Sequence, residues 1–387
     1  MDKLRLSASA IRTFKLCPLE YYYKYILGIR KIEKPEALRM GSNWHALLEI
    51  LNTGGGGVCP RCREEKEFDC PLCGTTGKLP DNIWDAIVAE LDHAYETIPM
   101  GVEQSDWLVE REILLQSVLA YKNLYKDDET IATEVPFKLP FIAPDGKPIM
   151  DAILIGKLDR INGDAKLVES KSTASDLSGD SQFWDSLQLD TQTLLYLSTI
   201  QRLQKEGKLS TYGIKPTDKL INETIYDVWR KPGIKAKNLT QAASKKFAAT
   251  GEYMGKKFGV VLAPEEQGGN FYVNEVPAEV TPGAKEGTFA IRETPGMFGA
   301  RLADDIVKDP DKYFVRKPVP RTNSDILAFD LELYRIYKTI KAMVKDDLWY
   351  RNEHQCRQMG KCDYINECYN QRRLTRDNSP DEFELIF

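Results

Sequence analysis

The chain has 387 residues, too many for one small core, so we expect one large domain with insertions or two domains. Its formal net charge of −5 argues against a protein that coats nucleic acid through bulk electrostatics, although a local basic groove remains compatible with it. No apolar run reaches membrane-spanning length, and the N-terminal segment MDKLRLSASAIRTFK is basic and polar. We therefore expect a cytoplasmic location and no membrane partner.

Helical periodicity dominates the first third of the chain. The segments that carry it are 7–25, 40–51, 81–96 and 107–125. Ser7 or Ser9 can cap the first of these helices, and Ser42 lies near the expected start of the second. The run TGGGG after the second helix predicts a flexible break before a group of cysteines.

From about residue 131 the pattern changes to short apolar runs with turn signals between them. These predict strands at 133–142, 148–161, 166–172 and 221–230, and helices at 185–204 and 324–344. The segment 231–295 has weak periodicity, so we expect an irregular insertion or lid with one strand-like stretch at 271–281. The fold class is α/β. The expected units are a helical part (1–53), a cysteine-rich insertion (54–78), the core (79–230), the insertion or lid (231–295) and a C-terminal helical region (296–387).

Eight cysteines in a cytoplasmic chain are poor candidates for four disulfides, and their spacing divides them into two sets of four. The first set is Cys59, Cys62, Cys70 and Cys73. Its spacing C-x2-C-x7-C-x2-C predicts a zinc ribbon or paired knuckle. Four thiolates leave no open position on the metal, so this Zn²⁺ site is structural, and the metal supplies folding energy that so small an insertion lacks.

The second set combines Cys17, near the N-terminus, with a C-x5-C-x5-C run near the C-terminus. The members of that run are Cys356, Cys362 and Cys368. Spacing alone does not distinguish Zn²⁺ from a four-iron cluster, because both accept four thiolates. Either metal would tie the N-terminal helix to the C-terminal tail.

A charged pattern stands out in GKLDRINGDAKLVESKST, residues 156–173. Side chains alternate along a strand, so Glu169 and Lys171 share one face. A two-residue turn would put Asp159 on the other face. A three-residue loop Asn-Gly-Asp with a bulge pairs Asp159 with Leu167 and brings Asp159 and Glu169 onto one diagonal, about 7–8 Å apart.

Two carboxylates at this separation suit Mg²⁺ or Mn²⁺, and a lysine beside the metal can orient a water molecule and offset charge on a phosphate. The alternative interpretation is a hairpin whose charged residues are simply exposed.

Five segments, in this order, resemble the PD-(D/E)xK nuclease superfamily, and in particular its RecB-type exonuclease branch, which includes AddB nuclease domains, CRISPR adaptation exonucleases and phage recombination exonucleases. They are LSASAIRTFKLCPLEYYYKY, GSNWHALLE, GKLDRINGDAKLVESKS, DTQTLLY and the C-terminal cysteine run. Glu169 stands where many relatives have aspartate. The quartet at 59–73 is not a general feature of the family, and 231–295 has no obvious counterpart in it.

The resemblance implies a restriction-endonuclease-like core, with a central mixed sheet flanked by helices, and a metal-dependent DNA exonuclease of recombination, repair or phage DNA processing. It places His45 with Asp159 and Glu169 at the metal, and it gives Gln192 and Tyr196 the task of fixing Lys171 and contacting a DNA phosphate. For the terminal cysteines it implies a [4Fe–4S] cluster whose first ligand is Cys17. Phage origin would place the protein in the host cytoplasm.

Several residues keep two interpretations. Basic residues near the expected DNA are Arg230, Lys231, Arg316, Lys317 and Arg321, although a basic run is most often a solvated face. Glu134 is either a carboxylate that supports the metal ligands or binds a second metal, or an exposed strand-end residue, and His45 could instead be a core histidine. His93 is expected to be structural or exposed.

Two other functions remain open, a DNA-binding scaffold without activity and an iron–sulfur redox sensor. The expected partners are linear DNA with free ends, a recombination or replication protein and further copies of the chain in an oligomer.

Overall fold

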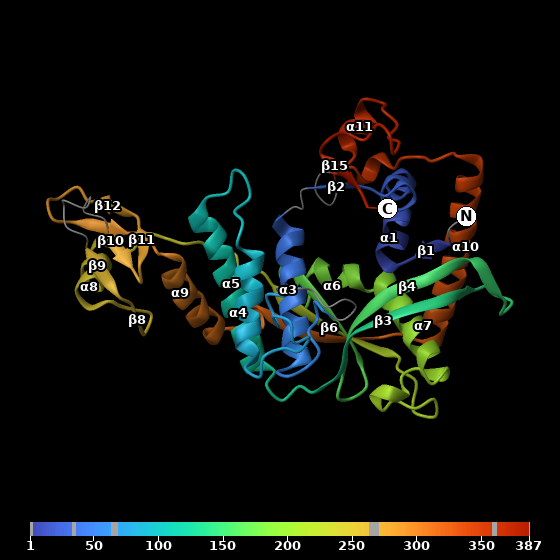
Figure 1. Ribbon diagram of the computed structural model, residues 1–387, viewed down its shortest axis with the longest axis horizontal. Coiled ribbons are helices and arrows are strands. Elements are labelled where there is room, and N and C mark those ends of the chain that lie inside the picture. The colour runs from blue at the N-terminus through green and yellow to red at the C-terminus, as the bar shows by residue number, and fades with distance from the viewer. Residues whose placement is uncertain (1–2, 33–35, 63–68, 263–270, 358–361, 387) are drawn as a thin grey trace.

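The computed structural model describes residues 3–32, 36–62, 69–262, 271–357 and 362–386. Its centre is a mixed sheet of six strands in the order β1-β4-β5-β6-β14, with β3 paired to β4. Helices α3, α4 and α5 lie to one side of this sheet and α1, α7 and α10 to the other (Figure 1). This arrangement confirms the predicted α/β class and the restriction-endonuclease-like core. None of the described helices is both long enough and apolar enough to cross a membrane.

The strands of the central sheet are β1 (Leu4–Leu6), β3 (Thr130–Ile142), β4 (Pro148–Asn162), β5 (Leu167–Thr173), β6 (Glu223–Arg230) and β14 (Phe314–Pro320). The helices around it are α1 (Ala8–Leu16), α2 (Pro18–Tyr21), α3 (Glu36–Thr53), α4 (Ile83–Ala94), α5 (Gln104–Leu124), α6 (Gln182–Leu187), α7 (Thr191–Lys205), α9 (Pro295–Lys308) and α10 (Asn323–Asp346). Single π or 3₁₀ turns follow at Tyr22–Leu27, Ser210–Tyr212, Pro310–Lys312 and Glu353–Gln355.

The sheet forks along one edge of β4. Strand β3 pairs with β4 over most of its length, so it occupies one edge. On the other edge, β1 runs parallel to residues 152–154, whereas β5 pairs antiparallel only at Arg160 and Ile161. Residues 155–159 therefore lie between two diverging neighbours. Asp159 is the last residue before the pairing with β5 begins at Arg160, and its side chain is placed in the opening of the fork.

The hairpin between β4 and β5 differs in register from the prediction. Arg160 pairs with Val168 and Ile161 with Leu167, which places Asp159 opposite Glu169 and not opposite Leu167. The loop is Gly-Asp-Ala, because Asn162 still pairs with Lys166 through its N–H and Ala165 takes the left-handed conformation, with φ 57°. The predicted register was wrong by two residues. A shift of two preserves the face, so Asp159, Glu169 and Lys171 share one side as expected.

Two predicted helices have different limits. Helix α3 begins at Glu36, so Ser42 lies inside it and is not its cap. The helix predicted at 185–204 is divided into α6 and α7, because Asp190 caps a new helix by accepting the N–H of Gln192. This division brings the N-terminus of α7 next to β5, where Gln192 contacts Lys171.

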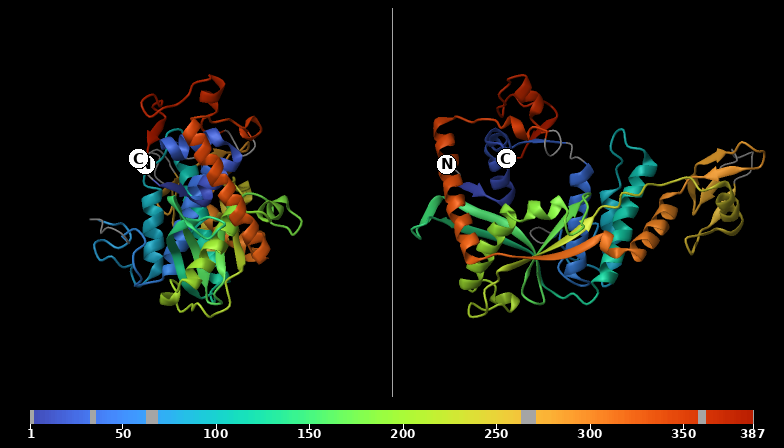
Figure 2. Two further views of the ribbon diagram at one scale, coloured as in Figure 1. Left: turned by 90° about the vertical axis from the view of Figure 1, so that its right-hand side faces the viewer. Right: turned by 180° about the vertical axis from the view of Figure 1, so that it is seen from behind.

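The described residues of the segment 231–295, all but 263–270, are not irregular. They form α8 (Gln241–Thr250) and the short strands β7 (Glu252–Tyr253), β8 (Lys256–Lys257), β9 (Val260–Leu262), β10 (Phe271–Val273), β11 (Val276–Ala278), β12 (Val280–Pro282) and β13 (Phe289–Ile291). Phe247, Phe258 and Ile291 are central to a separate apolar core. The strand-like stretch expected at 271–281 contains β10, β11 and most of β12, whereas the other strands, of two or three residues, leave almost no periodicity and were not predicted. Figures 1 and 2 show this lobe at one end of the molecule, beyond α5 and α9.

The C-terminal segment packs on the N-terminal one. Strand β15 (Phe383–Leu385) pairs antiparallel with β2 (Ile29–Lys31), and α11 (Ile365–Tyr369) lies nearby. Tyr364 stacks on Phe383 and donates a hydrogen bond to the carbonyl of Ile29. The N-terminal and C-terminal segments are thus held together by strand pairing and side-chain contacts, independently of any metal at the cysteines.

Candidate active site

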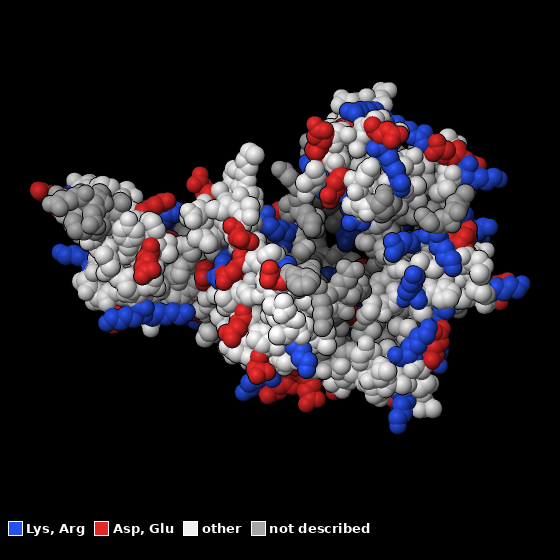
Figure 3. All heavy atoms as spheres, viewed as in Figure 1, with Lys and Arg blue, Asp and Glu red and all other residues white. Residues whose placement is uncertain are grey.

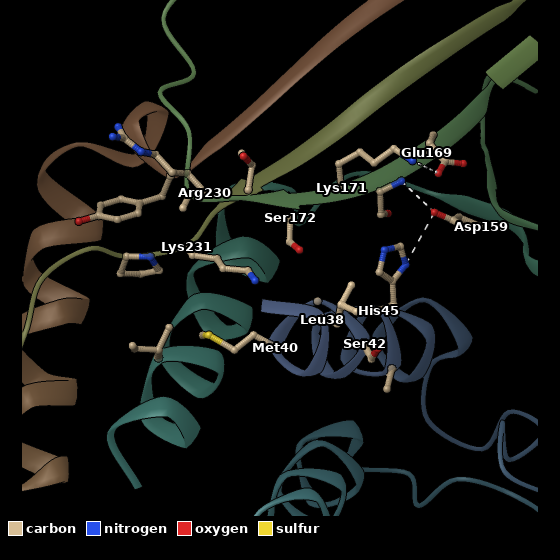
Figure 4. Close-up of a pocket in the computed structure, with 18 of the residues that line it drawn as sticks. Leu38, Met40, Ser42, His45, Asp159, Glu169, Lys171, Ser172, Arg230 and Lys231 are labelled. Atoms are coloured by element: carbon tan, nitrogen blue, oxygen red, sulfur yellow. Dashed lines mark hydrogen bonds and ion pairs between the residues drawn. The ribbon is translucent and has the colours of Figure 1, made fainter. Parts of the chain in front are cut away.

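The predicted catalytic residues gather where the sheet forks. Lys171 Nζ on β5 lies 2.8 Å from Glu169 Oε1 and 2.6 Å from Gln192 Oε1 on α7. Asp159 Oδ2 accepts the backbone N–H of Ser170 at 2.9 Å, which fixes the carboxylate beside Glu169 (Figure 4). The structure therefore brings together the Asp, Glu and Lys that the face argument selected.

Helix α7 holds the lysine in place. Gln192 Nε2 donates to the hydroxyl of Tyr196 one turn later, at 3.3 Å, which orients the amide oxygen toward Lys171. Asp190 lies 4.0 Å from the same ammonium. The predicted Gln-x-x-x-Tyr pair thus positions Lys171, while Asp190, which the sequence reasoning missed, adds a further negative charge.

His45 reaches the same point from α3. Its Nδ1 lies 3.7 Å from Asp159 Oδ2 (Figure 4). Ligand atoms of His45, Glu134 and Asp159 all lie within 4.8 Å of one another, close enough to hold one metal ion. Trp44, the neighbour of His45, stacks instead on Trp229 in the core. His45 therefore lines the site and does not belong to the apolar core.

Burial controls the protonation of these groups. It raises the pKa of Asp159 to about 7, and the nearby Glu134 carboxylate adds to the shift. Burial, followed by repulsion from Asp159, raises the pKa of Glu169 to about 8. Burial lowers the pKa of His45, so its imidazole is neutral and available as a ligand. For Lys171, burial opposes the charged form, but Glu169 and Asp190 outweigh it and its pKa is raised.

Glu134 was left between two interpretations, and the structure removes one of them. Its side chain is only 9% exposed, and its carboxylate lies 2.5 Å from Lys157 Nζ inside the cavity. It also has φ 50°, a left-handed conformation that costs a non-glycine residue about 1–2 kcal/mol. Glu134 is therefore not an exposed strand-end residue.

A cavity of about 1390 Å³ opens over the site. Arg12, Lys157, Arg230, Lys231 and Lys312 contribute positive charge to its lining. Figure 3 shows a hollow at the centre of this face, with basic side chains near its rim. Outside the carboxylates beside Lys171, the acidic residues of the lining are Glu36 and Glu49. A negative overall charge is therefore compatible with a cavity whose outer lining is mainly basic.

The other predicted basic residues lie elsewhere. Arg316, Lys317 and Arg321 belong to or follow β14 and are absent from the described lining of the cavity. Arg316 pairs with Asp227 at 2.9 Å and Asp128 at 2.8 Å, and Arg321 is buried and donates to the carbonyl of Leu187. These two arginines serve the fold. Lys317 lies over the ring of Trp184 at 4.9 Å.

Replacement of Arg316 by methionine is expected to lower the free energy of unfolding by about 3 kcal/mol, because the buried Asp227 would lose its closest cation. Urea unfolding measures the loss, and Lys338→Met on the exposed side of α10 is the control, expected within about 0.5 kcal/mol of wild type. If the Arg316→Met protein were as stable as wild type but bound DNA more weakly, Arg316 would instead be a residue that contacts DNA.

The first cysteine quartet forms a compact group. The sulfurs of Cys59, Cys62, Cys70 and Cys73 all lie within 4.8 Å of one another, with Cys59–Cys70 at 3.8 Å and Cys62–Cys73 at 3.5 Å. Thiolates around one tetrahedral zinc are separated by about 3.8 Å. Burial opposes ionisation of Cys70, but the backbone N–H groups of Leu72 and Cys73 lower its pKa. The quartet can hold a metal ion.

The glycine run before this quartet is a tightly packed, hydrogen-bonded turn and not the flexible break that was predicted. A Cβ on Gly55 would lie 2.1 Å from the carbonyl oxygen of Asp81, so only glycine permits the approach. Gly56 and Gly57 exchange backbone hydrogen bonds with Leu79. Cys59 and Cys70 pack into the same apolar core as α3 and α4, which anchors the small insertion.

The second cysteine set is less closely grouped. Among the described residues, the sulfurs of Cys17, Cys356, Cys362 and Cys368 do not form a cluster of the kind seen at 59–73. They are still neighbours. Burial raises the pKa of Cys362 to about 12, with Cys17 and Cys368 adding to the shift. Residues 358–361, between two of these cysteines, lie outside the described part of the chain.

His93 lies on α4 with its ring 43% exposed, near Glu96, as expected for a surface residue.

Lys157, Arg12 and Lys312 line the cavity but were not predicted from the sequence. Lys157 had a readable signal, because it is two residues before Asp159 on one strand and must share its face. Arg12 and Lys312 had none, since each reaches the cavity from a distant part of the chain.

A mixed sheet that presents aspartate, glutamate and lysine beside a histidine, under a basic cavity, suits metal-assisted hydrolysis of a phosphodiester. This combination defines a nuclease. The sequence matches the family model of the PD-(D/E)XK nuclease superfamily over residues 5–368, and the chain therefore belongs to that superfamily. No curated protein matches the sequence. Membership implies the use of divalent metal ions and a DNA substrate.

Proposed function

We propose that the protein is a Mg²⁺- or Mn²⁺-dependent DNA exonuclease that acts in recombination, repair or phage DNA processing. The observation that carries the proposal is the placement of Lys171, held between Glu169 and Gln192 beside the Asp159 carboxylate. A structural role alone does not explain an ammonium and two carboxylates at the floor of a large basic cavity. The nuclease would act in the cytoplasm, or in the host cytoplasm if it is encoded by a phage.

The site residues fit the implied metal. Glu169 Oε2 is buried and has no hydrogen-bond partner among the described residues, which is costly unless a cation binds there. His45 and Asp159 would hold the ion together with Glu134, whose ligand atom lies within 4.8 Å of theirs, and the third predicted ligand, Glu169, lies opposite Asp159 on the neighbouring strand. When bound, the ion would lower the pKa of a water and polarise the phosphate. Lys171 orients the attacking water and offsets charge on the phosphate, while Gln192 and Tyr196 keep the lysine at that point.

The cavity indicates how DNA would approach. Arg230 is the last residue of β6, and the register of β5 against β6 places it opposite Thr173, four residues beyond Glu169. That is about 13 Å along the strand. Arg230 and Lys231 would therefore contact backbone phosphates a short distance from the scissile one, and Arg12 and Lys157 would contribute positive charge nearer to it.

Degradation of end-labelled DNA tests this function. Linear and covalently closed circular duplexes, and a single-stranded oligonucleotide, are incubated with wild-type protein and Mg²⁺, Mn²⁺ or EDTA. We expect metal-dependent shortening of linear DNA and survival of the circles, and the position of the label identifies the polarity. Cleavage of circles at the same rate would replace the exonuclease by an endonuclease.

We also propose one zinc in the Cys59 quartet and a [4Fe–4S] cluster at Cys17, Cys356, Cys362 and Cys368. The sulfur spacing at 59–73 supports the zinc. The proposal of a four-iron cluster rests on the resemblance to the family and on the proximity of Cys17 and Cys368 to Cys362. The zinc insertion would serve as a docking surface for DNA or for a recombination or replication protein, and an oligomer would add processivity.

Loss of the zinc site is expected to destabilise the neighbouring helices. Cys70→Ser should remove about one zinc per chain and several kcal/mol of stability, because the metal replaces a core in this insertion and Cys70 packs against α3 and α4. Elemental analysis and thermal unfolding measure both effects. Thr75→Ala, at an exposed position of the same loop, is the control. Unchanged zinc content in Cys70→Ser would contradict the assignment.

A further inference from the structure

We propose that the extended segment 231–237 holds the phosphate backbone of DNA between the cavity and the apolar core of the lobe. The ammonium groups of Lys235 and Lys237 would contact the phosphates, so the contact is independent of base sequence. The inference rests on the proposed function, because it extends the path of the same DNA beyond the cavity.

The segment begins in the cavity and ends at the lobe. Lys231 donates its backbone N–H to the carbonyl of Thr173 at 2.7 Å, and it lines the cavity together with Pro232, Gly233 and Ile234. From there the chain leaves the central sheet and runs extended to the lobe (Figure 2). Six residues of extended chain cover at most about 20 Å. DNA that leaves the cavity on this side would therefore lie along the segment.

The side chains of the segment alternate between the protein core and the solvent. Ile234 and Ala236 pack against the apolar core that includes residues of α3, α4 and α5. Lys235 and Lys237 are exposed, and neither ammonium has an ion-pair or hydrogen-bond partner among the described residues. Alternation places the two lysines on one face about 6.6 Å apart, which corresponds to about two nucleotides of a DNA strand that rises about 3.4 Å per nucleotide. Both lysines can therefore contact phosphates of one strand.

A buried ion pair outside the proposed catalytic centre holds the backbone of the segment. Arg301 on α9 donates to the carbonyl of Lys235 at 2.7 Å, and Glu293 accepts the backbone N–H of Lys237 at 3.0 Å. Arg301 lies 2.5 Å from Glu293, whose side chain is 0% exposed. These bonds fix the peptide groups of the segment and leave its lysine side chains to the solvent. A backbone that is fixed before DNA arrives loses little conformational entropy when a phosphate binds.

The salt dependence of DNA binding tests the proposal without relying on activity. Full-length protein is titrated with fluorescent oligonucleotides of about 20 nucleotides, single-stranded or duplex, without added Mg²⁺ or Mn²⁺, at about 0.05–0.3 M salt. Lys235→Met/Lys237→Met should weaken binding by about 25- to 60-fold at about 0.1 M salt. The slope of log K against log salt should become shallower by about 1.4 for single strands or about 1.8 for duplex, because two phosphate contacts are lost. The DNA form with the larger loss is the one that lies along the segment.

Two further variants separate this contact from overall charge. Lys338→Met/Lys345→Met removes the same charge from exposed positions of α10, at the opposite end of the molecule (Figure 1). Its affinity should stay within about twofold of wild type, because charges so distant are screened by salt. Lys235→Arg/Lys237→Arg keeps both charges and should bind as wild type does. Thermal unfolding verifies that each variant is folded.

Equal losses of affinity in Lys235→Met/Lys237→Met and in the α10 variant would overturn the role of the segment and leave the proposed nuclease intact. An unchanged salt slope in Lys235→Met/Lys237→Met would overturn it as well, because no phosphate contact would have been lost. Failure of the wild type to bind either form of DNA would instead contradict DNA as the substrate.

Discussion

Replacement of Lys171 by alanine is expected to slow DNA hydrolysis by about 10³-fold. The reason is geometric, because its ammonium lies between Glu169 and Gln192 at the floor of the cavity, where a water and a phosphate would meet. Without it, the water is not oriented and the charge that develops on the phosphate is not offset. Single-turnover cleavage with excess enzyme and saturating metal measures the step without interference from product release.

Lys166→Ala is the matched control for this substitution. Lys166 is on the same hairpin but pairs with Glu223, with its side chain 39% exposed, and its removal should leave the rate unchanged. A Lys171→Ala rate within tenfold of wild type would exclude the catalytic role. If wild type and variant were equally inactive on every DNA substrate, the chain would be a DNA-binding scaffold of the same fold.

The affinity for Mg²⁺ or Mn²⁺ is expected to rise by about 10²–10³-fold between pH 6 and pH 8. Burial raises the pKa of Asp159 to about 7 and that of Glu169 to about 8, and each must lose its proton to bind the cation. Burial lowers the pKa of His45, so its imidazole contributes less to proton release in this range than an exposed histidine would. Calorimetry in buffers of different ionisation enthalpy measures both affinity and proton release.

The same pKa shifts determine how the stability of the metal-free protein changes with pH. Both carboxyls have pKa values near 4 when unfolded, and the folded values are higher. The contribution of these two carboxyls to the free energy of unfolding is therefore fully present below about pH 4, and it is lost as the pH rises through 7 and 8. Bound metal should remove this loss, which thermal unfolding with and without Mg²⁺ would detect. An affinity that stays flat from pH 6 to pH 8 would contradict the raised values.

The face that carries the proposed catalytic residues was predictable, because side chains an even number of residues apart lie on the same face of a strand. The register of the β4–β5 hairpin was wrong by two residues, yet Asp159, Glu169 and Lys171 still share one side. Strong periodicity likewise predicted α5 and α10, whose apolar positions repeat over many turns. Local pattern thus determined the elements and the face of the site.

Partners that are distant in the chain were not predictable. The segment VRKPVPRT was interpreted as a basic run for DNA, whereas it forms β14, and Arg316 is neutralised by Asp128 and Asp227 from other strands and loops. Nothing within that segment indicates those acids. The insertion at 231–295 was expected, but most of its strands were not, since strands of two or three residues are too short to show a period.

The fork at β4 has a consequence for synthesis of the chain on the ribosome. Strand β1 is made first, but its parallel partner at residues 152–154 appears about 150 residues later, and β2 pairs with β15 only when Phe383 has been made. Contacts of such long sequence separation form slowly. The nascent N-terminus must therefore wait with two unpaired strand edges exposed, which favours binding by a chaperone until the last residues emerge.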